Sequence, residues 1–212
     1  MTENAATLAG NVEDTSAFRL PHSALLDNPI KVGMLAFLLS EVAFFSTLIT
    51  TYVVFLRESK DGHPNPAEVF NGDWPLVLTA TGCLLASSVA IHFAERAFSS
   101  SNRAGFLGWW SLTIALGATF LACTAKEWYE LITRYGLTVA RNMFGSSYFT
   151  LVGFHAAHVT VGLILLSIML ALGWRRKISP EHKTGIEVVS WYWHFVDVVW
   201  IFVFSLVYII GR

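Results

Sequence analysis

The feature that most constrains the fold is the last apolar segment of the chain, residues 187–210. Read as a helix that rises about 1.5 Å per residue, this segment is roughly 35 Å long. That length crosses a bilayer core of about 30 Å with some tilt. No charged side chain follows Asp197 until Arg212. The segment therefore predicts a membrane-spanning helix.

Two ionisable side chains, His194 and Asp197, lie well inside this segment. A charged group at such depth costs roughly 2.5–3.5 kcal/mol on insertion scales, so both are expected to face protein. Their spacing of three places them on one helix face, within reach of a direct hydrogen bond. Glu187 and Trp191 continue this face, and Trp193 belongs to the same aromatic run. This helix face either packs against a neighbouring helix or forms a functional site. Both interpretations require partner helices.

The composition supports a membrane protein: 54% of residues are hydrophobic and 14% are charged, against roughly 25% charged in soluble domains. Long apolar runs predict an all-α integral membrane bundle of about five transmembrane helices. The expected spans are residues 31–56, 75–93, 104–125, 147–174 and 187–210. They form one transmembrane domain, residues 29–212, behind a polar tail, residues 1–28, that is expected to be flexible.

An odd number of spans puts the two termini on opposite sides of the membrane. Basic residues are somewhat more frequent on the N-terminal side, mainly in the loop 175–183, which predicts a cytoplasmic N-terminus and an external C-terminus. The net charge is −1, and no basic patch suits a nucleic acid partner. Cys83 and Cys123 are isolated in apolar runs and are expected to be small packing residues rather than a disulfide or a metal site.

Glu41 lies about 15 Å into the first span at helical rise, near the midplane of the membrane. Its neighbours on the same face are apolar: Phe37, Leu38, Phe44 and Phe45. These surroundings favour a neutral carboxyl, either hydrogen-bonded across a helix interface or exchanging protons. Another face of this span carries small residues that would let a neighbouring helix approach closely, namely Ser40, Ala43, Thr47 and Thr51.

The fourth span contains His155 and His158, which are three residues apart and share a helix face. Two such histidines can bind a metal, but a site needs further ligands, and only Glu41 and His194 lie deep enough to supply them. The pattern therefore favours interhelical hydrogen bonding over a metal site.

Two classes of protein remain open from these residues. One is a subunit of a larger membrane complex that carries no redox group, and the other is a small transporter whose buried acids and histidines carry protons. A transporter is expected to show helices interrupted by glycine or proline and a weak internal duplication. Neither is visible in the sequence, which favours the subunit.

Residues 191–200, WYWHFVDVVW, closely resemble the signature of subunit III of haem-copper cytochrome c oxidases. The other matching segments are residues 38–45, 127–130, 144–149 and 153–159. The resemblance covers residues 31–211 and is to the shorter, bacterial form of the family.

The resemblance implies a core subunit without redox groups in the bacterial plasma membrane, which is part of an enzyme but not itself catalytic. In the family, subunit I holds the haems and the oxygen-reducing copper, and subunit II takes electrons from cytochrome c. Subunit III packs on subunit I, binds phospholipids, supports proton uptake and protects the oxidase during aerobic respiration. Glu41 is implied to be the carbodiimide-reactive acid. The resemblance implies no catalytic residue, cofactor or metal in this chain.

The nearest alternative is the equivalent subunit of a quinol-oxidising haem-copper oxidase. Ser40, Glu41 and the intact WYWHFVDVVW run look more like the cytochrome c branch. A helper protein of nitric-oxide reductase is a third and less favoured alternative.

Overall fold

A computed structural model describes residues 28–58, 74–139, 143–175 and 182–210. The tail predicted to be flexible, residues 1–28, lies outside the described residues except for Asn28. Residues 57–73, between the first two predicted spans, and the basic loop 175–183 also lie largely outside them.

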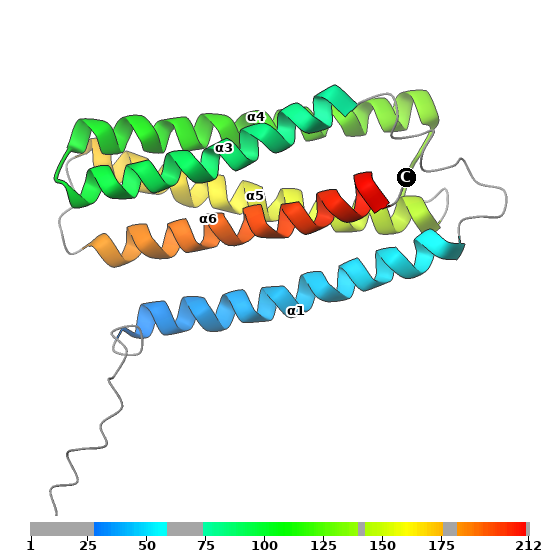
Figure 1. Ribbon diagram of the computed structural model, residues 1–212, viewed down its shortest axis with the longest axis horizontal. Helices are drawn as coiled ribbons and strands as arrows, with labels where there is room; N and C mark the ends of the chain where they lie inside the picture. Colours follow the sequence, from blue (N-terminus) through cyan, green and yellow to red (C-terminus); the bar gives the residue numbers. More distant parts are fainter. Residues whose placement is uncertain (1–27, 59–73, 140–142, 176–181, 211–212) are drawn as a thin grey trace, which may run out of the picture.

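The described chain consists of five long helices and a short π-helical end (Figure 1). In order they are α1 (Pro29–Glu58), α3 (Trp74–Ser99), α4 (Arg103–Tyr135), α5 (Met143–Trp174), α6 (Lys183–Phe204) and η3 (Ser205–Ile210). Five candidate spans result, with α6 and η3 forming one of them, and each is long and apolar enough to cross a membrane. The prediction of an all-α membrane bundle with five spans is confirmed.

The helices extend beyond several of the predicted ends. α4 continues to Tyr135 rather than ending at residue 125, because its stop signal is Gly136, whose left-handed φ of 59° lets its N–H bond the Leu131 carbonyl. At its start, the Asn102 side chain accepts a hydrogen bond from the Gly105 N–H. Apolarity marks only the part of a helix inside hydrocarbon, so the charged turns beyond it were not counted in the predicted spans.

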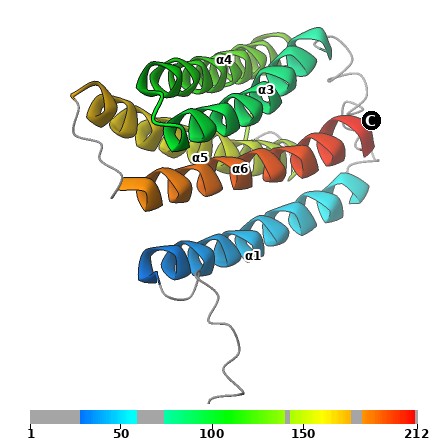
Figure 2. The same cartoon turned by 60° about the vertical axis from the view of Figure 1, so that its left-hand side comes forward.

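The helices form a bundle in which α6 is central and α1 is peripheral. Figures 1 and 2 show α3 and α4 side by side on one side of α5 and α6, with α1 lying on the other side. In the most apolar window of each helix, 44% of residues are buried in α6 but only 6% in α1. The small-residue face of α1 predicted to receive a helix is exposed in the described part of this chain.

Trp193 joins α6 to three other helices. Its ring is fully buried and lies against Gly117 of α4 and Gly162 of α5, and its indole Nε1 donates to Ser87 Oγ of α3 at 2.9 Å. A Cβ atom at Gly117 would lie 2.7 Å from Trp193 Cη2, and one at Gly162 would lie 2.8 Å from its Cε3. These two glycines are therefore required for the indole to fit between α4 and α5.

We expect Gly117→Ala to destabilise the protein by about 1–3 kcal/mol, because the added methyl group overlaps a buried ring that cannot move aside. Gly108→Ala is the matched control in the same helix, since a Cβ there meets nothing within 4 Å. Thermal unfolding in detergent, followed by near-ultraviolet circular dichroism, measures both. Equal unfolding midpoints for the two variants would contradict this account of the packing.

Candidate functional site

The deepest polar contact of α1 joins Glu41 to His158 of α5. Glu41 Oε2 lies 3.0 Å from His158 Nε2, and the two side chains are 17% and 18% exposed. The other ring nitrogen of His158, Nδ1, lies 2.7 Å from the Phe154 carbonyl oxygen of the same helix. Because a carbonyl oxygen only accepts, Nδ1 must carry a hydrogen in this arrangement.

Besides the hydrogen on Nδ1, the contact between Glu41 Oε2 and His158 Nε2 needs one proton of its own. Either Glu41 is the neutral acid and donates to Nε2, or His158 is a cation that donates to the carboxylate. The pair has no net charge in both cases, which makes it tolerable at membrane depth. Two roles were predicted for Glu41. The first, a hydrogen bond across a helix interface, is present, and the second, proton exchange, stays a prediction.

Aromatic side chains surround this pair. The rings of Phe45 and Phe44 lie 5.0 Å and 6.3 Å from the His158 ring, centroid to centroid. Tyr192 of α6 donates its hydroxyl hydrogen to the His158 carbonyl oxygen at 3.0 Å, so a third helix is attached to the contact. Tyr192 was not among the predicted site residues, although its position inside the WYWHFVDVVW run was the available signal.

The predicted direct hydrogen bond between His194 and Asp197 is wrong. Both side chains of α6 instead bond Ser88 of α3: its Oγ lies 3.0 Å from His194 Nδ1 and donates to Asp197 Oδ2. Asp197 is only 3% exposed, and its Oδ1 has no hydrogen-bond partner among the described residues. The prediction failed because one hydroxyl from a neighbouring helix forms hydrogen bonds with both side chains. The sequence of α6 does not indicate where that hydroxyl lies.

His155 and His158 have different surroundings, although they are three residues apart. His155 is fully buried, stacks on Trp200 with centroids 4.8 Å apart, and meets the edge of Phe120. Neither of its ring nitrogens has a hydrogen-bond partner within the described ranges. The predicted interhelical hydrogen bond is therefore present for His158 and absent for His155. Three residues turn a helix by about 300°, so the two rings meet different neighbours.

The structure brings no metal-ligand set together in the part of the chain that it describes. No three His, Cys, Asp or Glu side chains there could hold a metal ion. Cys83 and Cys123 are free and half-buried.

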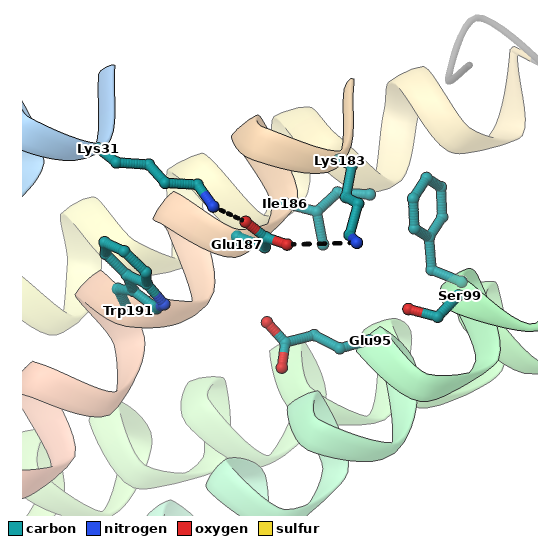
Figure 3. A pocket seen from close by; sticks show the side chains of 8 residues that line it. Lys31, Glu95, Ser99, Lys183, Ile186, Glu187 and Trp191 are labelled. Carbon is teal, nitrogen blue, oxygen red and sulfur yellow. Dashed lines mark ion pairs between the residues drawn. The ribbon is translucent and has the colours of Figure 1, made fainter. Parts of the chain in front are cut away.

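Glu187 and Trp191 lie at the membrane-edge pocket, a cavity of about 410 Å³ lined by residues of α1, α3 and α6 (Figure 3). Glu187 binds Lys31 of α1 at 2.6 Å and Lys183 at 3.8 Å. The Lys31 ammonium also lies 5.7 Å from the centre of the Trp191 ring, a cation–π distance. Glu95 of α3 points toward these groups from the opposite wall. The pocket therefore combines charges of both signs with an aromatic wall.

A second buried acid, Glu127 of α4, was not predicted as a site residue. It is 5% exposed and accepts a hydrogen bond from the Tyr208 hydroxyl of η3 at 2.6 Å. The Tyr208 oxygen lies 3.3 Å from that of Tyr148 on α5. The charged run around Glu127, residues 126–130, gives no sign in the sequence of a buried acid, and only the extension of α4 together with the π-helical end explains its burial.

These contacts define the class of protein. The polar side chains discussed above either join helices or line a pocket at the membrane edge. The chain is thus a multi-helix membrane protein whose described polar groups serve mainly to hold its helices together.

Comparisons with known proteins identify the family. The model of the cytochrome c oxidase subunit III family matches residues 7–212. The chain is 36% identical over 192 residues to cytochrome c oxidase subunit 3 of Corynebacterium diphtheriae, covering 86% of this chain and 89% of the relative. It is 35% identical over 192 residues to cytochrome c oxidase subunit 3 of Bacillus subtilis, with coverage of 90% and 91%. It is 38% identical over 180 residues to cytochrome bo(3) ubiquinol oxidase subunit 3 of Pseudomonas putida, with coverage of 85% of each chain. The chain belongs to the cytochrome c oxidase subunit III family.

Replacing Glu41 tests the contact between α1 and α5. We expect Glu41→Gln to keep near-native stability, because the amide can still donate to His158 Nε2. Glu41→Leu leaves that nitrogen unpaired and should cost about 1–3 kcal/mol. Thermal unfolding of the purified protein compares the two variants. A loss in Glu41→Gln as large as that in Glu41→Leu would show that the carboxyl group does more than supply a hydrogen bond.

Proposed function

We propose that this chain is the redox-silent core subunit III of a proton-pumping haem-copper cytochrome c oxidase. Its role is to stabilise the haem-bearing subunit I, to bind phospholipid and to support proton uptake during aerobic respiration. The observation that carries the proposal is the use of its buried polar groups. Glu41 bonds His158, Ser88 bonds Asp197 and Trp193 bonds Ser87, so each contact fixes one helix against another. Such a bundle suits a supporting subunit of a larger enzyme.

A quinol-oxidising haem-copper oxidase is the second candidate for the complex. The observation that favours it is the 38% identity to a ubiquinol oxidase subunit 3, which is close to the 36% for a cytochrome c oxidase subunit 3. Electron donors do not react at subunit III in either complex, so the contacts in this chain do not separate the two. The intact WYWHFVDVVW run supports the cytochrome c branch.

The proposed topology has the start of α1 in the cytoplasm of a bacterium and the complex in its plasma membrane. In support, basic residues gather at the ends of helices on that side: Lys31, Arg96, Arg103, Arg175 and Lys183. Fewer described basic residues, among them Lys126 and Arg134, lie toward the other side. Cytoplasmic ends of membrane helices carry an excess of Lys and Arg.

The membrane-edge pocket is the proposed place of a phospholipid headgroup. Lys31 is held closely by Glu187, but Lys183 is 63% exposed and its ammonium lies 3.8 Å from the same acid, which leaves it available to a phosphate. Among the described residues no ion pair involves Glu95. A zwitterionic headgroup fits both, with its phosphate toward Lys183 and its ammonium toward Glu95.

We expect Glu95→Gln to lower the amount of phosphatidylethanolamine retained by the purified complex relative to phosphatidylglycerol. The loss in relative affinity should be about tenfold, because a hydrogen bond between charged groups contributes about 1.5 kcal/mol or more. Native mass spectrometry with equimolar lipids measures the ratio. Glu130→Gln at the other end of the bundle is the control, and an equal change in both variants would contradict the proposed headgroup site.

Purification through a tag on this chain tests the assignment of the complex. We expect a coloured preparation with haem absorption that consumes oxygen with reduced cytochrome c. Oxygen consumption with a quinol alone would instead establish the second candidate. A colourless, homogeneous preparation without large partner subunits would contradict both and would favour the transporter class.

A further inference from the structure

Three side chains form an uninterrupted chain of hydrogen bonds between α3 and α6. His194 Nδ1 lies 3.0 Å from Ser88 Oγ, and Ser88 Oγ bonds Asp197 Oδ2. A serine hydroxyl has one hydrogen and two lone pairs, so Ser88 donates to one neighbour while it accepts from the other. The chain can therefore run in either direction.

The two directions are related by the movement of two hydrogens. In the first, His194 Nδ1–H donates to Ser88, and the Ser88 O–H donates to Asp197. In the second, Asp197 is protonated and donates to Ser88, and Ser88 donates to Nδ1. If His194 begins as a cation, its Nδ1–H bond breaks, the proton passes to Ser88, and the hydrogen of Ser88 forms an O–H bond on Asp197. Imidazolium and carboxylate thereby become a neutral pair, and no other reactant is needed.

Asp197 depends on this chain for contact with water. It is 3% exposed, whereas His194 is half-buried. The titratable side chains of α3 that act electrostatically on His194 are Glu95 and His92. Glu95 also lines the membrane-edge pocket shown in Figure 3. Glu95 follows Ser88 on α3 by seven residues, about two helical turns, so the pocket lies along the same helix face as this chain of hydrogen bonds.

The other helices against α6 supply no competing partner among their described residues. On α5, His158 bonds Glu41, and His155 lies in the aromatic stack with Trp200. On α1, Lys31 is paired with Glu187 of α6. Among the described residues Asp197 Oδ1 has no partner, and protonation of Asp197 lowers the cost of its burial, because a neutral carboxyl is easier to bury in a dry site than a carboxylate.

We propose that His194, Ser88 and Asp197 form an internal proton-binding site, in which Asp197 exchanges its proton with the membrane-edge pocket through Ser88 and His194. This site goes beyond the supporting function proposed above and needs no haem, copper or electron donor. It also gives Ser88 a proton-transfer role that a packing contact alone would not require.

Infrared spectroscopy of the purified complex tests the site without reference to oxidase activity. The carbonyl band of the Asp197 carboxyl is identified as the band lost in Asp197→Asn, and its shift after transfer to D₂O gives the exchange rate. We expect Ser88→Ala to slow this exchange about a hundredfold, the effect of losing one positioned proton-transfer group. Ser88→Thr keeps the hydroxyl and should restore the rate. Ser190→Ala, which removes another buried hydroxyl near the start of α6, should leave it unchanged.

Native-like exchange in Ser88→Ala would overturn the proposal, as would the absence of any carboxyl band lost in Asp197→Asn. If Ser88→Ala does not fold, His194→Asn provides a second test. Its amide nitrogen takes about the position of Nδ1 and can still donate to Ser88, but it cannot pass a proton on. Slow exchange in that variant supports the relay, and a native rate overturns it.

Discussion

The cost of an unpaired polar group in hydrocarbon is the constraint on which the rest of this structure depends. A bilayer offers no water to such groups, so each must find a partner on its own helix or on another, or be held in a closed protein interior. Glu41 meets His158, Asp197 meets Ser88, and the Trp193 indole meets Ser87. These contacts fix which helix faces meet, because apolar side chains are nearly as well solvated by lipid as by one another.

The contacts are distributed unequally among the helices. α6 places a tryptophan between two glycines and binds α3 through hydroxyl groups, so it forms the centre of the bundle. α1 has little buried surface, and its identified polar contacts are Glu41 with His158, Lys31 with Glu187 and Asn28 with Thr184. With so little buried surface, α1 is held to the bundle in part by these polar contacts, and its apolar outer face is available to lipid or to a partner subunit.

Much of the fold could be predicted, since apolar length alone identifies a span. The five spans and the tendency of the WYWHFVDVVW segment to face protein follow from one helix at a time. The site was predicted less well. His194, in the same helix, was predicted to be the hydrogen-bond partner of Asp197. The observed partner is Ser88 of α3. His155 was expected to form a hydrogen bond across a helix interface and instead stacks on Trp200, and the buried acid Glu127 was not predicted as a site residue.

The sequence by itself determined that this chain is a helical membrane protein, which residues belong to its spans and, through its motifs, the family to which it belongs. These properties follow from local composition and spacing, because the bilayer imposes the same length and polarity requirement on every span. Only the tertiary structure decided which groups become partners. Hydrogen bonds between helices join residues up to 119 positions apart, as for Thr81 and Trp200, and helix rotation and packing select them. A serine or a glycine on a neighbouring helix has no distinctive pattern in sequence, yet Ser88, Gly117 and Gly162 determine how α6 is held.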